Sequence, residues 1–376
     1  MDKRRILFLI PSLVGGGAER TLINLLHKID LNHYAVDLVT VLGKGPYMNQ
    51  IPEGVKLITL FNNEMVVRGL AYLQKKIGFD WLFKAVMQGK VKGSYDVSIC
   101  FLDSNFTDLL FFVKDAGKRY SWVHSSYKSY KNFYKFYQNE QYRNKLIRNR
   151  YGKLDGIFFV SDDARQEFVE VFGQFPNMEV VYNMIDREMV LHKAEEPMAF
   201  DQRQFNFVTV GSLFPVKGYD RLIRSAKLLK DKGHQFKVHI LGKGMEEANL
   251  KGLSEKLGLG DTIVFHGFTS NPYPYMKAGD AFVMSSVSEA LPTVLCEAMI
   301  LGKAVVVTNC SGCRELVDKE RYGLMAEQDD ASLAFKMEQY LVDRELLARN
   351  AAQAAQRSAV FDTGKVMQKY YEIFNN

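Results

Sequence analysis

The feature that most constrains the fold is an alternation of short apolar runs with helical patterns, which begins at the N-terminus. In the first half the apolar runs lie at residues 6–10, 36–42, 55–60, 97–101, 120–123 and 157–160. They are continuous rather than alternating, which is typical of parallel strands that are covered on both faces. Between them lie helical patterns, such as the one over residues 22–29. This series predicts a doubly wound α/β domain.

A second series follows a polar stretch at residues 192–205, which contains Pro197 and has no periodicity. Its apolar runs lie at 207–210, 238–241, 263–266, 281–284 and 304–308, with helical patterns around 220–230, 245–257, 293–301 and 333–355. A chain of 376 residues is long enough for two hydrophobic cores. We therefore expect an N-terminal domain (1–191), a linker (192–205), a C-terminal domain (206–360) and a final helix (361–376) that crosses back to the N-terminal domain. The carboxyl ends of the two parallel sheets would face a central cleft.

The composition excludes several classes of protein. No run of eighteen apolar residues occurs, so no spanning helix is expected. The basic residues 3–5 and the apolar run 6–10 resemble a signal peptide, but the run ends at Pro11 and is too short, which favours a buried strand and a cytoplasmic protein. Four cysteines do not make a disulfide framework in a chain of this length. Cys310 and Cys313 form a lone C-x-x-C, for which reduced loop thiols are favoured over a zinc or redox site.

Three motifs carry candidate chemistry, and the first is Gly15-Gly16-Gly17 after the first apolar run. Glycines there let the backbone approach a ligand, and a helix beginning at about Ala18 would point its positive end at that ligand. The alternative is a tight turn required only for packing. The full G-x-G-x-x-G pattern is absent, and the second apolar run ends in Val41-Leu42 without an acidic residue to hold a ribose, which disfavours a nicotinamide-binding protein.

The second motif, residues 211–218, follows the first apolar run of the second series and contains Lys217 between glycines. A cation at this edge of a sheet suits a diphosphate, and a solvated loop lysine is the alternative. The third motif, residues 288–299, places Glu289 before Pro292 and Glu297 inside a helix that begins near Thr293. The first N–H groups of that helix would form an anion site, and the two carboxylates would hold two different hydroxylated groups.

Taken in order, these motifs resemble the retaining glycosyltransferases of family 4, which have the GT-B fold of two Rossmann-like domains. The resemblance spans nearly the whole chain and extends to enzymes of bacterial capsule, O-antigen and lipid-linked oligosaccharide assembly. Its most specific part is the E-x7-E pattern from Glu289 to Glu297. The other matching segments are residues 16–20, 182–186, 217–218, 266–268, 302–306 and 312–316.

The resemblance implies a role for each matching residue. His124 and Glu289 would be catalytic, with His124 in contact with the transferred sugar. The implied donor-binding residues are Gly16, Gly17, Ser212, Lys217, Phe268, Glu289, Leu291, Pro292, Thr293, Val294 and Glu297. Among these, Lys217 would bind the diphosphate, Glu297 the ribose, and Phe268 would sit beside the base. The family usually has Arg at the position of Ser212 and Gly at the position of Ala290, which leaves the second diphosphate cation and the sugar preference open.

The resemblance implies a retaining transferase that moves a hexose or N-acetylhexosamine from a nucleotide sugar, expected to be UDP-linked, to a glycan acceptor, and it suggests that this acceptor is linked to a polyprenyl diphosphate. No D-x-D motif is present, so we expect metal-independent activity without a cofactor. A non-catalytic sugar-nucleotide-binding module is the alternative, and a nicotinamide oxidoreductase is a weaker one.

The basic aromatic segment, residues 125–150, holds seven Lys or Arg, one acidic residue and seven Tyr or Phe. Residues 1–190 carry the whole net charge of +6. Such a segment suits an anionic membrane surface or a lipid-linked acceptor, with an ordinary solvated helix as the alternative and nucleic acid disfavoured. The contacts would come from Lys128, Lys131, Lys135, Arg143 and Lys145. We thus expect a cytoplasmic protein that is peripheral on the inner face of the cell membrane.

Overall fold

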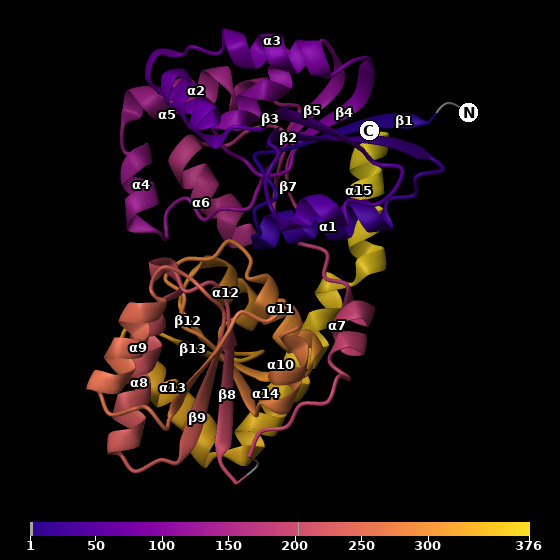
Figure 1. The fold of residues 1–376 in the computed structure, drawn as a ribbon. Helices are drawn as coiled ribbons and strands as arrows, with labels where there is room; N and C mark the ends of the chain where they lie inside the picture. Colours follow the sequence, from indigo (N-terminus) through magenta and orange to yellow (C-terminus); the bar gives the residue numbers. More distant parts are fainter. Residues whose placement is uncertain (1–2, 202) are drawn as a thin grey trace. The chain divides into compact units, whose positions relative to one another are not determined.

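The computed structural model describes residues 3–201 and 203–376 and divides into two compact units (Figure 1). Unit 1 consists of the residues up to 127, 132–184 and 364–376, and unit 2 consists of 128–131 and 185–363. The chain therefore enters unit 2 at residue 185, ahead of the expected linker at 192–205. Helix α7 (Arg187–Lys193) packs against α10 (Tyr273–Ala278) and α11 (Thr293–Ile300), which accounts for this difference.

Unit 1 is built on a seven-stranded sheet in the order β3-β2-β1-β4-β5-β6-β7, and every neighbouring pair is parallel. The strands are β1 (Arg4–Ile10), β2 (Tyr34–Leu42), β3 (Lys56–Phe61), β4 (Ser94–Cys100), β5 (Asp115–Val123), β6 (Gly156–Phe159) and β7 (Met178–Val180). The helices between them are α1 (Gly17–Lys28), α2 (Glu64–Ile77), α3 (Trp81–Lys90), α4 (Lys131–Tyr137), α5 (Glu140–Asn149) and α6 (Asp162–Phe172). The last five residues of β1 are fully buried, as expected for a central strand covered on both faces.

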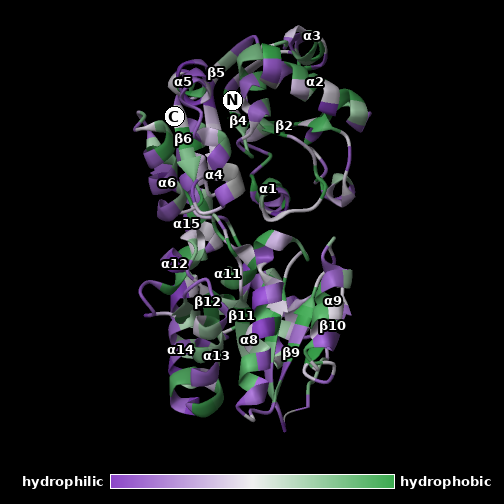
Figure 2. Ribbon diagram, turned by 90° about the vertical axis from the view of Figure 1, so that its left-hand side faces the viewer, coloured by the Kyte–Doolittle hydropathy of each residue, from purple (hydrophilic) through white to green (hydrophobic). Residues whose placement is uncertain are grey.

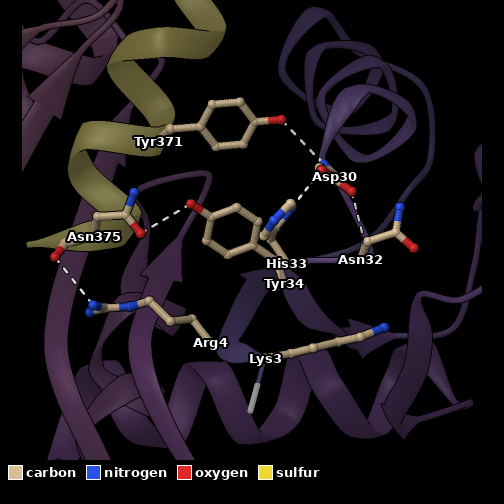
Figure 3. A pocket seen from close by; sticks show the side chains of 8 residues that line it. All are labelled: Lys3, Arg4, Asp30, Asn32, His33, Tyr34, Tyr371 and Asn375. Carbon is tan, nitrogen blue, oxygen red and sulfur yellow. Dashed lines mark hydrogen bonds and ion pairs between the residues drawn. The ribbon is translucent and has the colours of Figure 1, made fainter. Parts of the chain in front are cut away.

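The C-terminal helix α15 (Thr363–Asn375) belongs to unit 1, apart from its first residue. Phe374 packs against Phe8 of β1, and the ring of Tyr370 stacks on Trp122 of β5 with a centroid distance of 4.8 Å. At the amino ends of β1 and β2, the hydroxyl of Tyr371 accepts a hydrogen bond from the N–H of Asp30 (Figure 3). The helix therefore packs along the sheet, from Trp122 near the carboxyl end of β5 to the amino ends of β1 and β2.

Unit 2 contains a six-stranded parallel sheet in the order β10-β9-β8-β11-β12-β13. The strands are β8 (Phe205–Val210), β9 (Phe236–Leu241), β10 (Ile263–Gly267), β11 (Ala281–Met284), β12 (Ala304–Thr308) and β13 (Leu324–Ala326). The remaining helices are α8 (Tyr219–Asp231), α9 (Glu247–Lys256), α12 (Ser311–Val317), α13 (Asp330–Val342) and α14 (Arg344–Arg357). Counted within the unit, the order is the 3-2-1-4-5-6 of Rossmann folds, so the strand order reverses between β8 and β11.

The expected fold class is confirmed, because both units are doubly wound parallel α/β layers with hydrophobic strands between amphipathic helices (Figure 2). One expected helix, at 333–355, is wrong as a single element. The carboxylate of Asp343 accepts a hydrogen bond from the N–H of Leu346, and this cap begins a new helix after α13. Within the described residues, no helix is both long enough and apolar enough to cross a membrane.

Candidate functional site

The centre of the candidate site in unit 2 is an ion pair between Lys217 and Glu289. The Lys217 Nζ lies 2.6 Å from the Glu289 Oε1, and the two side chains are 23% and 12% exposed. Lys217 follows β8 and Glu289 follows β11, the two neighbouring strands at which the strand order reverses. Ligands of open α/β sheets bind outside the carboxyl ends of the strands at such a point. The structure thus brings together two residues that are 72 positions apart.

Tight backbone packing holds this pair in place. Gly218 has a φ of +61°, and a Cβ at this position would lie 2.2 Å from the carbonyl oxygen of Ser285, so only glycine fits. The Ser285 hydroxyl donates to the carbonyl of Lys217, and the Ser286 hydroxyl donates to the Glu289 Oε1 over 2.8 Å. The loops after β8 and β11 are therefore joined by both main-chain and side-chain contacts.

The pair keeps the lysine charged although it is largely buried. Burial by itself would lower the pKa of Lys217, but the charge and hydrogen bond of Glu289 outweigh that effect and hold the pKa above its ordinary value. An ammonium group has three N–H donors, and Glu289 occupies one of them in this structure. Lys217 is accordingly a cation with donor capacity left for an anionic ligand.

The second carboxylate of the motif lies on α11, which begins at Thr293 as expected, with Pro292 immediately before it. Glu297 is half-buried on this helix, and its Oε1 accepts a hydrogen bond of 3.1 Å from the hydroxyl of Tyr273. Leu291 is buried, while Thr293 and Val294 are half-buried at the start of the helix. The sequence analysis missed Tyr273, because no local pattern connects it to a residue 24 positions away.

Two further predicted donor contacts lie on exposed loops of unit 2. Ser212 is exposed after β8, and Phe268 is 70% exposed directly after β10. An exposed aromatic ring at the carboxyl end of a strand is available to stack on a planar ligand. Lys243, in the neighbouring loop after β9, accepts a backbone hydrogen bond of 3.0 Å from Leu213. It is an exposed cation beside the loop in which Ser212 replaces the usual Arg.

The C-x-x-C cysteines are free thiols, and both are buried. Cys310 caps α12 and Cys313 lies in its first turn. A hydrogen bond with Cys310, together with burial, raises the pKa of the Cys313 thiol well above its ordinary value. Within residues 3–201 and 203–376, no group of three or more His, Cys, Asp and Glu is arranged to hold a metal ion.

In unit 1, the predicted glycine turn forms the start of α1. Gly16 is the residue before the helix, and Gly17 is its first residue. Gly15 has a φ of +109°, which favours glycine and fits the tight turn left open as the alternative by the sequence, whereas a Cβ on Gly16 would meet only the flexible Glu19 carboxylate. Burial raises the pKa of Glu19, although backbone hydrogen bonds of Glu19 and Gly16 act in the opposite direction.

His124 directly follows β5, and its ring lies against Phe101 with a centroid distance of 4.9 Å. Burial lowers the pKa of His124 to about 3, so the imidazole is neutral near pH 7. Its Nε2 atom is buried and has no hydrogen-bond partner among the described residues. Buried polar groups are normally satisfied, so this atom has unused capacity for a hydroxyl group of a ligand.

A buried network, which the sequence analysis missed, holds the loop after β5. The Asp103 carboxylate accepts hydrogen bonds from the hydroxyls of Ser121, Thr107, Tyr127 and Tyr151. Asp103 lies two residues after the predicted strand at 97–101, and an acidic residue so close to the carboxyl end of a strand is a signal that could have identified it. Because Ser121 and Tyr127 flank His124, the network fixes the backbone on both sides of the histidine.

In the structure, the charged side chains and the aromatic side chains of the basic aromatic segment lie in different environments. Its lysines at 128, 131, 135 and 145 are exposed, and Arg143 donates to the carbonyl of Tyr137 over 2.9 Å. The aromatic ring of Tyr127 is buried, and Tyr137 and Tyr142 are packed against the same hydrophobic cluster as Phe168 and Phe172. The expectation that interleaved aromatic side chains of this segment face a membrane is therefore wrong for these residues, because their rings build the core.

Matches to protein families extend over nearly the whole chain. Residues 15–189 match the family described as Glycosyltransferase Family 4, and residues 193–357 match the family described as Glycosyl transferases group 1. The chain belongs to glycosyltransferase family 4. The resemblance stated from the sequence motifs is thereby confirmed.

Individual proteins agree with this membership. One relative is N-acetylgalactosamine-N,N'-diacetylbacillosaminyl-diphospho-undecaprenol 4-alpha-N-acetylgalactosaminyltransferase of Campylobacter jejuni. The two sequences are 33% identical over 224 residues, and this alignment covers 59% of this chain and 60% of that protein. For three other curated relatives the match covers 45%, 45% and 48% of their length. The fold of this chain is similar to that of Anabaena Alr3699/HepE in complex with UDP, with a TM-score of 0.76 at 20% identity over 99% of both chains. The chain therefore has the GT-B fold. Sucrose-phosphate synthase from Thermosynechococcus elongatus reaches 0.82 at 17% identity, over 99% of this chain and 98% of that one.

Proposed function

We propose that this chain is a retaining glycosyltransferase that moves a hexose or N-acetylhexosamine from a UDP-sugar to a glycan on a polyprenyl diphosphate. The observation that carries the proposal is the Lys217–Glu289 pair at the switch point of the second sheet, with Glu297 on the adjoining helix. The undecaprenol-linked substrate in the name of the Campylobacter relative supports a lipid-linked acceptor, and the UDP bound to the Anabaena protein supports the nucleotide.

The pair suits a sugar nucleotide because it presents a cation and a carboxylate side by side. The Lys217 Nζ and the Glu289 Oε1 are 2.6 Å apart, and each can make one further hydrogen bond to a ligand. A phosphate oxygen bound to Lys217 and a sugar hydroxyl bound to Glu289 would then lie within about 8 Å of each other. A sugar and the diphosphate attached to it meet that limit. Glu289 would orient the sugar, Lys217 would stabilise charge developing on the leaving diphosphate, and Glu297 would accept from the ribose hydroxyls.

The remaining predicted residues complete the proposal. We assign the neutral imidazole of His124 to a hydroxyl of the transferred sugar and Phe268 to the base. Lys217 and the first N–H groups of α11 would meet the phosphate charge, so no metal is needed. We also propose that the enzyme works at the inner face of the cell membrane, with the exposed lysines of residues 125–150 drawn to anionic lipid.

The test is release of nucleoside diphosphate from a panel of nucleotide sugars, with and without a polyprenyl-diphosphate-linked glycan. We expect acceptor-dependent UDP release and a product whose anomeric configuration, read by NMR, is that of the donor. Binding of UDP-sugars without turnover on any acceptor would instead indicate the non-catalytic binding module. Inversion of the anomeric centre would contradict the retaining assignment alone.

A further inference from the structure

A row of large apolar side chains lies exposed on α2 and at the start of α3. Met65 is 81% exposed, Ile77 69% and Trp81 59%. We call this row the α2–α3 apolar surface, and its members are Met65, Val66, Tyr72, Leu73, Ile77 and Trp81. Single exposed apolar residues are ordinary, but contiguous groups of this size mark an interaction site.

The spacing shows that the five members on α2 share one side of that helix, and Trp81 is the first residue of α3. Positions 65, 66, 69, 72, 73, 76 and 77 recur at three and four residues and form one stripe. The opposite stripe, with Val67 and Leu70, is buried in the core of unit 1. In Figure 2 hydrophobic and hydrophilic residues alternate along α2. The core therefore accounts for only one apolar stripe of this helix, and the second is turned to the outside.

The charge around this surface is positive. Residues 64–92 contain six Lys or Arg and only two acidic residues. One of these acids, Glu64, is already paired with Lys44 at 2.6 Å and with Arg68 at 2.5 Å. Lys76 donates to the hydroxyl of Tyr72 over 2.9 Å, and Lys84 lies one turn after Trp81. A basic rim around apolar and aromatic side chains is complementary to anionic headgroups above an acyl layer.

We propose that the α2–α3 apolar surface inserts into the headgroup region of a bilayer that contains anionic lipid. In the basic aromatic segment the rings of Tyr127, Tyr137 and Tyr142 pack into or against the core. The α2–α3 apolar surface instead offers exposed apolar area and charge together, as interfacial binding requires. The inference rests on the proposed function for its biological purpose, because a polyprenyl-linked acceptor lies in such a bilayer. The physical contact itself can be measured without turnover.

Trp81 provides a direct measurement on the unaltered protein. The chain has two tryptophans, and Trp122 is fully buried. Any change of emission on adding vesicles of phosphatidylglycerol and phosphatidylcholine therefore reports Trp81. We expect a blue shift, protection from iodide quenching, and quenching by brominated acyl chains. Pure phosphatidylcholine vesicles should give a smaller response at the same lipid concentration.

A matched pair of double variants tests the position of the contact. The test variant is Ile77→Gln with Trp81→Gln, and the control is Val342→Gln with Phe335→Gln on α13, whose side chains are 67% and 54% exposed. In vesicle co-sedimentation we expect the partition coefficient of the test variant to fall about tenfold or more, while the control stays at the parent value. Unchanged melting temperatures and unchanged turnover with a soluble acceptor show that both variants are folded.

Each outcome decides the inference. Equal sedimentation of the test variant and the parent, or a Trp81 emission unaffected by anionic vesicles, overturns it. A concentration-dependent dimer that the test substitutions dissociate also overturns it, because the occupant is then a second copy of the chain. If the test variant fails to fold, Lys76→Glu with Lys84→Glu replaces it, and vesicle binding equal to that of the parent at low salt has the same meaning. Vesicle binding without any transferase activity supports the inference and contradicts the proposed function.

Discussion

Breaking the Lys217–Glu289 pair from each side should have opposite consequences for ligand binding. In the free protein each side chain neutralises the other, at 2.6 Å and with 23% and 12% of the side chains exposed. Removal of either partner leaves a largely buried charge without compensation. We therefore expect Lys217→Ala and Glu289→Gln each to lower the free energy of unfolding by about 1–3 kcal/mol. The double variant should lose less stability than the two single variants lose together, with a coupling energy of about 1–2 kcal/mol.

Affinity for the nucleoside diphosphate separates the two residues. Lys217→Ala removes a charge-assisted hydrogen bond, worth about 1.5–3 kcal/mol, so the Kd for UDP should rise about ten- to hundredfold. Glu289→Gln removes the competitor for the ammonium group, so the Kd should stay level or fall while kcat falls. Equal effects of the two changes on the Kd would refute the assigned roles.

Calorimetric titration with UDP and urea denaturation provide the two measurements. The control is Lys336→Ala, because Lys336 pairs with Glu320 at the same distance of 2.6 Å and is similarly buried, with 18% of its side chain exposed. This control should lose stability but bind UDP normally. An unchanged Kd in Lys217→Ala would show that the diphosphate is held elsewhere. A coupling energy of zero would show that the ion pair does not contribute to the free energy of unfolding.

Three further predictions follow from the site. Glu297→Gln should raise the donor Kd about tenfold through loss of a charged acceptor, and Tyr273→Phe should have a smaller effect in the same direction; unaltered affinity in calorimetry would reject the ribose assignment. Turnover should survive EDTA, and activity that disappears in the chelator and returns with magnesium or manganese would reject metal independence. Because the folded-state pKa of His124 is lowered from 6.5 to about 3, the stability it contributes is complete above pH 6.5 and is lost as the pH falls toward 3. Urea unfolding at pH 7.5 and 5 should show that His124→Gln reduces this acid loss by up to about 2 kcal/mol, and an identical loss in both proteins would contradict the burial argument.

Local sequence predicted the strands of four or more residues, including β3 and β10 at the edges of their sheets. The apolar runs at 6–10 and 304–308 coincide with β1 and β12, because a strand buried on both faces needs a continuous apolar run. The short strands β7 and β13 were not predicted. Each has three residues at the edge of its sheet, and pairing with one neighbour rather than a local pattern defines them.

The polar beginning of β5 illustrates the same limit. Residues 115–119 were not part of the predicted strand, since Lys118 and Arg119 interrupt any apolar run. In the fold these residues pair with β4, and the N–H of Arg119 donates to the Asp155 carboxylate over 2.9 Å. Contacts that far apart in sequence leave no local signature, so the strand was predicted only from residue 120 onward.

The sequence by itself determined the family, the two parallel sheets and the start of α11 at Thr293, because periodicity, glycine turns and helix-start residues are local properties. The tertiary structure decided which side chains meet. It joined Lys217 to Glu289 and packed the rings of Tyr127, Tyr137 and Tyr142 into or against the core of unit 1. It also left a second apolar stripe of α2 outside. Each outcome depends on packing between segments that are distant along the chain, and no local pattern specifies which face of an amphipathic segment will find a partner.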